Sequence, residues 1–381
     1  MLFLFLGACT KDAPSKDRPV LDDSVSSADD SSTPTYPDLV VWLTVDTLNE
    51  RYLGHYDERN TTPNLDELFK QSVVFENTYV SQGVTIVSLP TIATGTYPRV
   101  HRIRSIEDQE SSPVPMVQTI LGEVGWTTWA YSSNFCEPIQ TEGWDKAFCA
   151  APGQTDVEYS DDRERDLALV ERLASDLDDR PDGPLFIWLH LRDPHITYTP
   201  RSPWIEQFWT GEAMTPMSLA DMDPYALDEL EPDEDLIAWI DAVYASQVAS
   251  SDALIGQVIQ GLKARGLYEN AVVITGTDHG EELGWHNDYW YHGCSMYEGV
   301  LNTTWSVRTP GGTPGVVQTP VHSVDVLPTT FELIGVDPDY GFDGRSLAGA
   351  LRGEIIEPRP VFFERGKYAA GVAVGERKYW R

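Results

Sequence analysis

The sequence predicts an α/β protein with a mostly parallel central sheet flanked by helices. Three continuous apolar runs, rich in β-branched and aromatic residues, lie at 39–45, 185–191 and 271–275. Such runs form strands that are buried on both faces, as is usual in a parallel sheet. Segments with apolar residues at helical spacing lie between them, and this alternation is typical of an α/β sandwich.

Shorter patterns predict the remaining elements. Helices are expected at 63–69, 116–124, 163–177, 237–265 and 325–334, and further strands at 73–79, 127–131, 361–363 and 368–374. The acidic and aromatic stretch 201–236 has no regular pattern, and we expect it to form a surface excursion that shapes a pocket rim. The chain is long enough for one large catalytic domain, which we assign to 38–355, with a small strand-containing part at 356–381.

The charge balance limits the partners that the protein can bind. The chain carries 60 acidic and 27 basic residues, for a net charge of -33 at pH 7. Such a chain repels nucleic acid and anionic membrane surfaces, so we expect no nucleic-acid partner. A small anionic ester can still bind where a metal cation and helix N-termini reverse the field inside a pocket.

The N-terminal segment indicates export and lipid attachment. The first nine residues, MLFLFLGAC, are apolar but too short to span a bilayer, which takes about 20 residues. Residues 1–8 are typical of the end of a signal peptide, and LGAC at 6–9 resembles the lipobox of bacterial lipoproteins, which are acylated on the cysteine. The usual basic start is missing, so either the true start lies upstream or the resemblance is accidental.

The segment that follows supports the lipoprotein interpretation. Residues 9–37 are rich in Ser, Asp, Pro and Thr and are expected to form a disordered acidic tether. We therefore expect an exported protein that is anchored in a bacterial cell envelope, in the periplasm or at the outer membrane, through a lipid on Cys9. The lipid anchor would be its only contact with the membrane.

The other cysteines are candidates for pairing, because an exported protein folds in an oxidising compartment. Cys136 and Cys149 lie close in sequence and could form a disulfide, which would leave Cys294 free. The alternative is that all three are ordinary buried thiols.

Four polar clusters follow strand-like runs. They are Asp46-Thr47, Asp193-Pro194-His195, Asp278-His279 and the loop around Thr85. The carboxyl ends of parallel strands meet at one edge of a sheet, so these side chains are expected to converge there. A single Asp or His at a strand end is usually a helix cap or a satisfied surface residue, but four clusters together favour a site.

The segment DHGEE at 278–282 is the strongest metal-site candidate. It contains a carboxylate and an imidazole in adjacent residues, and both groups can coordinate the same divalent ion. Mixed oxygen and nitrogen ligands favour zinc or manganese over calcium. His286 and His292 follow closely in a chain with only eight histidines. The alternative is a polar loop with chance histidines.

Thr85 is a candidate nucleophile. It lies in GVTIVSLP at 83–90, where Ser88 is a candidate cap for a helix that runs to Gly95. A hydroxyl just before a helix N-terminus can be deprotonated by a metal and attack phosphorus or sulfur, whose oxygens then face free N–H groups. The residues alone also fit a simple turn threonine.

Seven ordered motifs resemble the sulfatase family of the alkaline-phosphatase superfamily, over most of the chain from residue 38. The motifs are DTL at 46–48, TPNLD at 62–66, TGTYP at 94–98, LRDPH at 191–195, TDHGEELG at 277–284, HGCSMYE at 292–298, and DVLPTTFELIG at 325–335 with DGRSL at 343–347. The resemblance implies an alkaline-phosphatase-like sandwich and a metal-dependent hydrolase of anionic esters. Relatives often continue into a C-terminal subdomain, so 356–381 is expected to be a shortened form of it.

The resemblance also implies roles for individual residues. Asp46, Asp278 and His279 would hold one divalent metal ion, with Thr85 at the nucleophile position. His195 and His292 would bind the anionic group or protonate the leaving oxygen, tasks that suit imidazolium near neutral pH.

The nucleophile loop departs from the usual sulfatase pattern. Sulfatases typically have a cysteine or serine that becomes formylglycine, within C-x-P-x-R, whereas this chain has Thr85 with Val87 and Leu89 at the proline and arginine positions. Threonine cannot become formylglycine, so we expect an unmodified nucleophile. Thr85-x-x-Ser88-x-Pro90 instead resembles the loop of phosphoethanolamine transferases, which use a threonine.

Further departures concern the neighbouring motifs. Thr96 replaces the arginine of TGR, one aspartate stands at Asp46 where many sulfatases have two, and His279 replaces an asparagine. Together these residues weaken a specific assignment to sulfate esters.

Three functions are compatible with the sequence. The first is a hydrolase of sulfate or phosphate esters, acting on a small anionic ester, a sulfated or phosphorylated glycan, or a lipid headgroup. The second is a phosphoryl or phosphoethanolamine transferase, although the transmembrane helices typical of those enzymes are absent. The third is a catalytically degenerate surface lipoprotein that only binds anionic glycans.

Overall fold

A computed structural model describes residues 36–381 except 106–111, 134–142, 156, 219, 223–231, 285–289, 294, 367 and 376. The signal-peptide end, Cys9 and nearly all of the tether therefore lie outside the described residues, as do Cys136, His286 and Cys294. Residues 36–381 form one compact unit. The boundary at 355/356 and the lipoprotein assignment remain predictions.

The core of this unit is a nine-stranded sheet in the order β10-β2-β9-β6-β1-β5-β3-β4, with β11 also pairing with β2. Its strands are β1 (Leu39–Val45), β2 (Val73–Tyr79), β3 (Thr127–Ser132), β4 (Lys146–Cys149), β5 (Leu185–Leu191), β6 (Ala271–Thr277), β9 (Asn302–Arg308), β10 (Gly315–Val317) and β11 (Val321–His322). Among these strands, β9 alone runs antiparallel to its neighbours, β2 and β6. The prediction of a mostly parallel sheet is confirmed.

The three apolar runs form the middle of the sheet. β1 pairs with β5 on one side and with β6 on the other, both in parallel. Every residue of these three strands is buried, because helices cover both faces of the sheet. This double burial explains why their sequences are continuously apolar rather than alternating.

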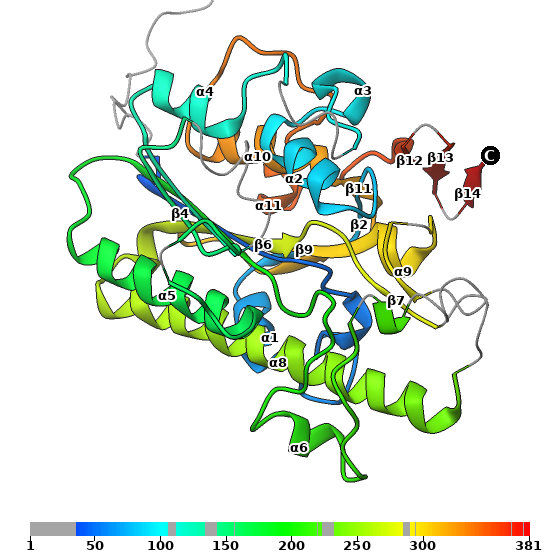
Figure 1. Ribbon diagram of the computed structural model, residues 1–381. Helices are drawn as coiled ribbons and strands as arrows, with labels where there is room; N and C mark the ends of the chain where they lie inside the picture. Colours follow the sequence, from blue (N-terminus) through cyan, green and yellow to red (C-terminus); the bar gives the residue numbers. More distant parts are fainter. Residues whose placement is uncertain are drawn as a thin grey trace, which may run out of the picture. The chain divides into compact units, whose positions relative to one another are not determined.

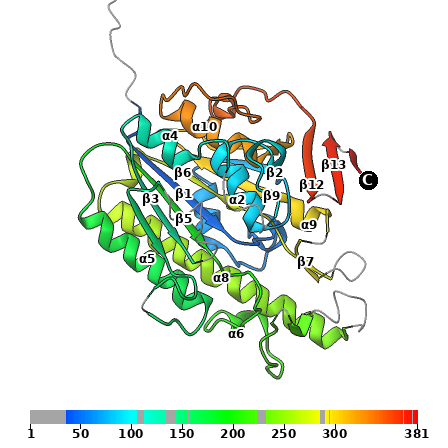
Figure 2. The same ribbon diagram turned by 45° about the horizontal axis from the view of Figure 1, so that its top comes forward.

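Two layers of helices enclose the sheet (Figures 1 and 2). One layer contains α1 (Pro63–Phe69), α5 (Asp162–Asp178) and α8 (Glu234–Ala264); the other contains α2 (Thr85–Thr94), α4 (Val117–Glu123), α10 (Val326–Leu333) and α11 (Ala348–Leu351). Each layer packs on its own face of the sheet and forms a separate hydrophobic cluster. The chain is therefore the α/β sandwich that its sequence predicts. No helix in the described ranges is long and apolar enough to cross a membrane.

The smaller elements lie beyond the carboxyl ends of the parallel strands. β7 (Glu282–Leu283) and β8 (Trp290–Tyr291) form a hairpin, and α9 (Glu298–Leu301) follows it. β12 (Val361–Arg365), β13 (Ala369–Val374) and β14 (Arg377–Trp380) form an antiparallel sheet, hereafter the C-terminal sheet. Figure 2 shows β12 and β13 beside α9. The small strand-containing part is confirmed.

Several local predictions were wrong or incomplete. α2 begins at Thr85 because Val84 is its extended N-cap, so Ser88 lies inside the helix and is not a cap. The Ser88 hydroxyl instead donates to the Gln82 carbonyl at 2.5 Å. β9 was not predicted, since its polar and apolar residues, NTTWSVR, have no clear apolar pattern.

The described part of 201–236 is mostly irregular, as expected. It contains the short helix α6 (Ile205–Phe208), and Tyr198 pairs with Met217 in an isolated bridge. α8 begins at Glu234, three residues before the predicted start, where Asp233 caps it by accepting from the Leu236 amide. The role of this stretch as a pocket rim remains a prediction.

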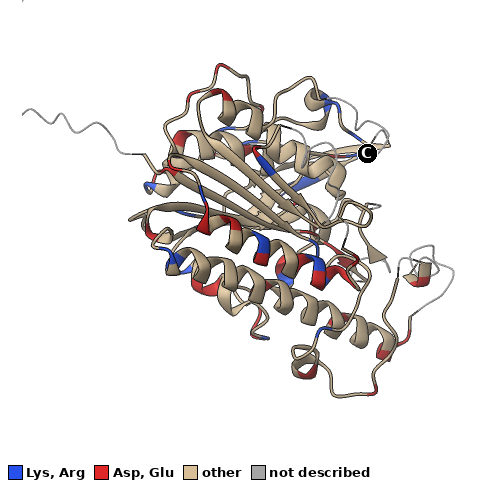
Figure 3. Cartoon of the chain, turned by 60° about the vertical axis from the view of Figure 1, so that its left-hand side comes forward, with Lys and Arg blue, Asp and Glu red and all other residues tan. Residues whose placement is uncertain are grey.

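Charged residues are few in the central sheet, where the described strands contain only Glu76, Lys146 and Arg308. Figure 3 shows the central strands almost entirely without charge, with Asp and Glu on the surrounding helices and loops. Acidic residues on the outer faces of the helices and loops are screened by water, whereas Asp166, Asp193, Glu281 and Glu282 are buried.

Replacing Leu189 by alanine tests the doubly covered core. Leu189 is fully buried in β5, so Leu189→Ala should lower the free energy of unfolding by about 2–5 kcal/mol. Val316, 54% exposed in β10, is the matched control, and Val316→Ala should change it by less than about 0.5 kcal/mol. Urea denaturation followed by circular dichroism measures both, and equal effects would contradict this packing.

Candidate active site

Two buried carboxylates lie side by side at one edge of the sheet. Val45 and Thr277 are partners in the β1–β6 register, so Asp46 and Asp278, the next residues, emerge at the same sheet edge. The ring of His279 completes the group, with its Nε2 atom 3.5 Å from Asp278 Oδ2 and 3.8 Å from Asp46 Oδ1. One ligand atom from each of the three residues lies within 4.8 Å of the others. The predicted convergence at the strand ends is confirmed.

Local hydrogen bonds orient these side chains. His279 Nδ1 lies 2.9 Å from the Gly280 carbonyl oxygen, which can only accept, so Nδ1 carries the proton and the lone pair of Nε2 faces the two carboxylates. Asp278 Oδ1 accepts from the His279 amide at 2.9 Å and from the Thr47 amide at 3.3 Å. Asp278 Oδ2 is buried and has no hydrogen-bond partner within the described ranges.

The electrostatics of the three residues favour a bound cation. Burial is the main cause that raises the pKa of Asp46 and of Asp278 to about 7, and burial also lowers the pKa of His279 to about 4. Two carboxylates and a neutral imidazole in a dry site form a donor set that compensates its desolvation by holding a divalent ion. The residues present therefore fit one divalent metal ion.

The backbone at the end of β1 is held in an unusual conformation. Thr47 has a φ of 57°, in the left-handed region that a β-branched residue rarely adopts. Tyr244 of α8 donates its hydroxyl proton to the Thr47 carbonyl at 2.5 Å and accepts from the Asn49 amide at 3.0 Å. This contact fixes the turn that directs Asp46 and the Thr47 amide toward the site.

Gly280 allows the close approach of a second loop. A Cβ atom at this position would lie 2.0 Å from the Gly299 carbonyl oxygen. The Gly280 amide donates to the Val300 carbonyl at 2.9 Å, which ties the metal-ligand loop to α9. Glycine is thus needed at position 280 because any side chain would collide with the backbone at Gly299.

Thr85 faces the same cluster from the start of α2. Its Oγ1 atom lies 3.3 Å from Asp46 Oδ1 and 3.3 Å from His279 Nε2. No side chain of the described residues caps α2, whose first intrahelical bonds are made by the amides of Val87 and Ser88. The earlier amides of the helix, at Thr85 and Ile86, can therefore bind the oxygens of an anionic group.

Two more histidines close the group. The His292 ring lies 4.6 Å from the His279 ring and 4.8 Å from the His195 ring, centroid to centroid. His292 Nδ1 is 3.0 Å from Glu281 Oε1, and His195 Nδ1 is 2.5 Å from the Ile196 carbonyl oxygen. The structure thus brings together all six predicted catalytic and metal-ligand residues.

The charge of these histidines differs from the sequence-based expectation. Burial is the main cause that lowers the pKa of His292 to about 4 and the pKa of His195 well below its usual range. Both rings are therefore neutral near pH 7 in the free protein, not imidazolium. A bound anionic ester would favour the protonated form.

Sequence reasoning missed three residues near the site. His190, in β5, places Nε2 4.0 Å from Asp46 Oδ2. The positive charge of Arg192 acts on Asp46, His195 and His292 and lowers the pKa of each. Glu281 supports His292. All three stand within or directly beside the LRDPH and DHGEE motifs, so proximity to a motif was the available signal.

The structure describes only one of the two cysteines in the predicted disulfide. Cys149, in β4, is disulfide-bonded. The other three cysteines lie outside the described residues, and the pairing with Cys136 remains a prediction.

The comparisons with known proteins agree with this geometry. The family model described as Sulfatase matches residues 38–336. The chain belongs to the sulfatase family. This is a family of ester hydrolases that generally binds a divalent metal, which confirms the resemblance and is consistent with the Asp46, Asp278 and His279 cluster.

Among relatives of this sulfatase-family chain, the choline-sulfatase of Rhizobium meliloti is 22% identical over 83% of the chain and 72% of the relative. An ulvan-active sulfatase of Formosa agariphila is 23% identical over 82% of the chain and 54% of the relative. The chain thus spans between about half and three quarters of the length of these two relatives.

Solved structures share the fold. The phosphonate monoester hydrolase of Agrobacterium radiobacter has a TM-score of 0.73 at 17% identity, over 91% of this chain and 87% of that one. A sulfatase structure from Bacteroides thetaiotaomicron has a TM-score of 0.74 at 20% identity, over 91% and 83% of the two chains.

Metal loading tests the cluster. Protein stripped with a chelator should gain thermal stability when a divalent ion is added, because binding to the folded state alone raises its stability. Asp278→Asn and His279→Ala should each abolish this rise in Tm and the bound metal, measured by calorimetry and mass spectrometry. Glu67→Gln, on an α1 side chain that is 61% exposed, is the control and should bind metal normally. A stripped protein with an unchanged Tm in Zn²⁺, Mn²⁺ and Ca²⁺ would count against the site.

Proposed function

We propose that this chain is a metal-dependent hydrolase of sulfate or phosphate esters in which unmodified Thr85 is the nucleophile. One observation carries the proposal: Thr85 Oγ1 lies 3.3 Å from an aspartate oxygen and 3.3 Å from an imidazole nitrogen of the metal-ligand cluster, at the start of α2. A hydroxyl in that position has acceptors for its proton and stands next to amides that can receive the oxygens of an ester.

The nucleophilic step follows from these contacts. The Thr85 hydroxyl passes its proton to the Asp46 carboxylate, 3.3 Å away, and its oxygen attacks the sulfur or phosphorus, while the bond to the leaving oxygen breaks. The amides of Thr85 and Ile86 stabilise the negative oxygens of the transition state. A divalent ion held by Asp46, Asp278 and His279 would lower the pKa of the hydroxyl and neutralise charge. Water then releases the covalent Thr85 ester.

The leaving oxygen needs a proton, and His292 or His195 can deliver it. His292 Nδ1 lies 3.0 Å from Glu281 Oε1, a contact that fixes the ring and leaves Nε2 as the exchangeable position. The ester anion stabilises the protonated ring that burial disfavours in the free protein. Arg192 adds positive charge that attracts the same anion.

The kind of ester is proposed from two observations. Thr85 cannot form formylglycine, and Val87 and Leu89 replace the proline and arginine of the sulfatase signature, which favours phosphate. Phosphonate monoester hydrolases from two bacteria share the fold, at TM-scores of 0.73. The sulfatase relatives include choline-sulfatase, and one similar structure holds D-glucosamine-2-N,6-O-disulfate as its substrate. We propose a small anionic ester, an anionic glycan or a lipid headgroup as substrate.

Two further proposals complete the assignment. The mixed oxygen and nitrogen donors of the cluster favour Zn²⁺ or Mn²⁺ over Ca²⁺. The lipobox-like segment 6–9 supports a lipid-anchored enzyme in a bacterial cell envelope, which acts on substrates outside the cytoplasm.

Substitution of Thr85 tests the nucleophile. Thr85→Ala should lower kcat on aryl phosphate, aryl sulfate and phosphodiester substrates by at least about a thousandfold, because no covalent intermediate can form. Thr85→Ser keeps a hydroxyl and should retain measurable turnover, with both variants checked for an unchanged Tm. Full activity in Thr85→Ala would refute the assignment, and transfer of the group to added alcohols instead of water would identify a transferase.

Substitution of His292 tests proton delivery. His292→Gln should lower kcat/KM about a hundredfold or more for alkyl esters, whose leaving oxygen needs a proton, and much less for p-nitrophenyl esters. His55, bonded to Glu76 away from the cluster, gives the control variant His55→Gln, expected to be unchanged for both. An equal loss for both ester types would remove His292 from this role.

A further inference from the structure

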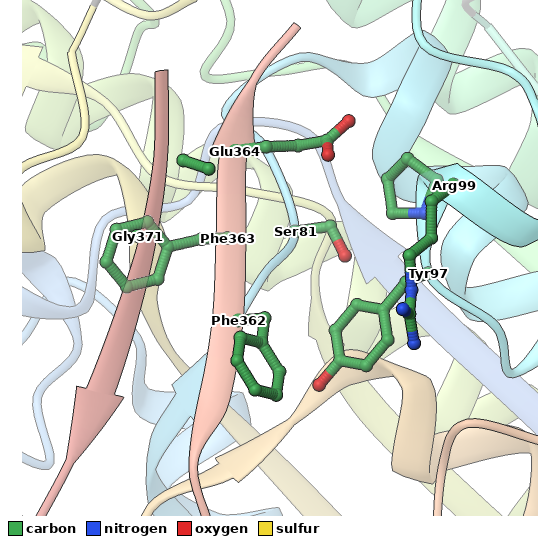
Figure 4. Close-up of a pocket in the computed structure, with 9 residues that line it drawn as sticks. Ser81, Tyr97, Arg99, Phe362, Phe363, Glu364 and Gly371 are labelled. Carbon is green, nitrogen blue, oxygen red and sulfur yellow. The ribbon is translucent and has the colours of Figure 1, made fainter. Parts of the chain in front are cut away.

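A cavity lies between the C-terminal sheet and the segments that flank α2. Its volume is about 240 Å³, and its walls come from the C-terminal sheet, from Tyr97 and the start of α3 (Pro98–His101), and from Ser81 just after β2 (Figure 4). Three chain segments far apart in sequence thus build it. None of the residues that line it belongs to the metal-ligand cluster.

Aromatic rings form the apolar walls of the cavity. The Tyr97 and Phe362 rings lie 5.9 Å apart, centroid to centroid, and stand nearly perpendicular at 84°. Phe363, the next residue in β12, is only 2% exposed because it packs in a buried cluster, whereas Phe362, which also lines the cavity, keeps 51% of its surface exposed. Figure 4 shows both rings at the same end of the cavity as Ser81. A large aromatic surface is therefore left open toward a bounded space.

A buried hydroxyl in the cavity wall lacks a partner. Ser81 is fully buried, and its Oγ atom has no hydrogen-bond partner within the described ranges. Figure 4 shows this oxygen directed between the Tyr97 and Phe362 rings. An unsatisfied buried hydroxyl is unfavourable, and a hydrogen bond to a ligand hydroxyl in the cavity would remove that cost.

The charged groups of the cavity balance each other. Glu364 is held by Arg104 through hydrogen bonds of 2.8 and 3.1 Å, and Arg99 lies 3.6 Å from Asp343. The two arginines and the two carboxylates balance each other, so the cavity has no excess positive charge that would bind a free anion. Their remaining donors and acceptors suit neutral hydroxyl groups.

We propose that this cavity is a sugar-binding site that holds a non-reacting residue of a glycan substrate. A sugar ring offers an apolar C–H face for Tyr97 and Phe362 and a rim of hydroxyls for Ser81, Glu364 and Arg99. The inference deepens the proposed function and rests on it, since it selects glycan esters among the possible substrates.

The cavity is tied to the reacting centre through the chain. The Glu364 amide donates to the Ser81 carbonyl at 2.7 Å, and the Gly366 amide donates to the Gln82 side chain at 3.2 Å. Ser81 precedes Thr85 by four residues, so their Cα atoms are at most about 14 Å apart. A glycan of a few residues can therefore occupy both places, and its binding in the cavity holds its ester near Thr85.

Binding and turnover of desulfated tetrasaccharides from ulvan, carrageenan and a glycosaminoglycan test the proposal. Isothermal titration calorimetry with the Thr85→Ala protein should detect binding of at least one of these tetrasaccharides. A second substitution in the same protein, Phe362→Ala or Arg99→Gln, should raise the Kd about tenfold. Tyr379, 54% exposed on the same sheet face but outside the cavity, supplies the control, and Tyr379→Ala should bind normally. In the active protein, Phe362→Ala should lower kcat/KM on a sulfated tetrasaccharide about tenfold and leave aryl-ester turnover unchanged.

Each other outcome separates this inference from the proposed function. Absence of binding by all three tetrasaccharides, or equal binding by the Phe362 and Tyr379 variants, would overturn the sugar site while Thr85 chemistry still stood. If p-nitrophenol bound in a way that depended on Phe362 and no sugar bound, the cavity would be assigned to aromatic ligands instead. Intact cavity binding with full turnover by Thr85→Ala would overturn the proposed function alone.

Discussion

The parallel pairing of β1 and β6 determines where the chemistry of this protein lies. It brings Asp46 and Asp278 out of the sheet at the same level, where burial raises the pKa of both carboxyl groups to about 7. Two such groups repel each other and have lost their hydration, so the arrangement is costly without positive charge beside them. The Thr47 and His279 amides supply part of that compensation, and a divalent cation would supply the rest.

The rest of the fold keeps this cluster in place. Tyr244 of α8 holds the strained turn at Thr47 from one helical layer, while α2 presents Thr85 from the other. Gly280 lets the metal-ligand loop touch α9. The two helical layers therefore do more than cover the sheet, because each contributes a group that orients the reacting atoms.

Electrostatics reconciles an acidic protein with an anionic substrate. Many acidic side chains lie on the outer helices and loops (Figure 3), whereas Asp46, Asp278 and Glu281 are buried at the site itself. Arg192 adds positive charge there, the histidines are neutral, and a bound metal would offset the two carboxylates of Asp46 and Asp278. The net charge of -33 is a property of the whole chain, and the field inside the pocket depends on the groups that line it.

The sequence by itself predicted the fold class, the family and the six candidate site residues, of which His292 followed from the resemblance alone. A continuous apolar run indicates a strand that is buried on both faces, and a polar residue directly after the run indicates the edge of the sheet. Both patterns can be recognised in a short stretch of sequence. Tertiary structure alone decided the insertion of β9, the true start of α2 at Thr85, the supporting contacts of Tyr244, Glu281 and His190, and the cavity at Ser81. Most of these features depend on contacts between segments far apart in sequence, such as Tyr244 with Thr47, and such contacts leave no periodic pattern in the chain. The neutral state of His195 and His292 belongs with them, because a pKa is set by three-dimensional burial and not by residue type.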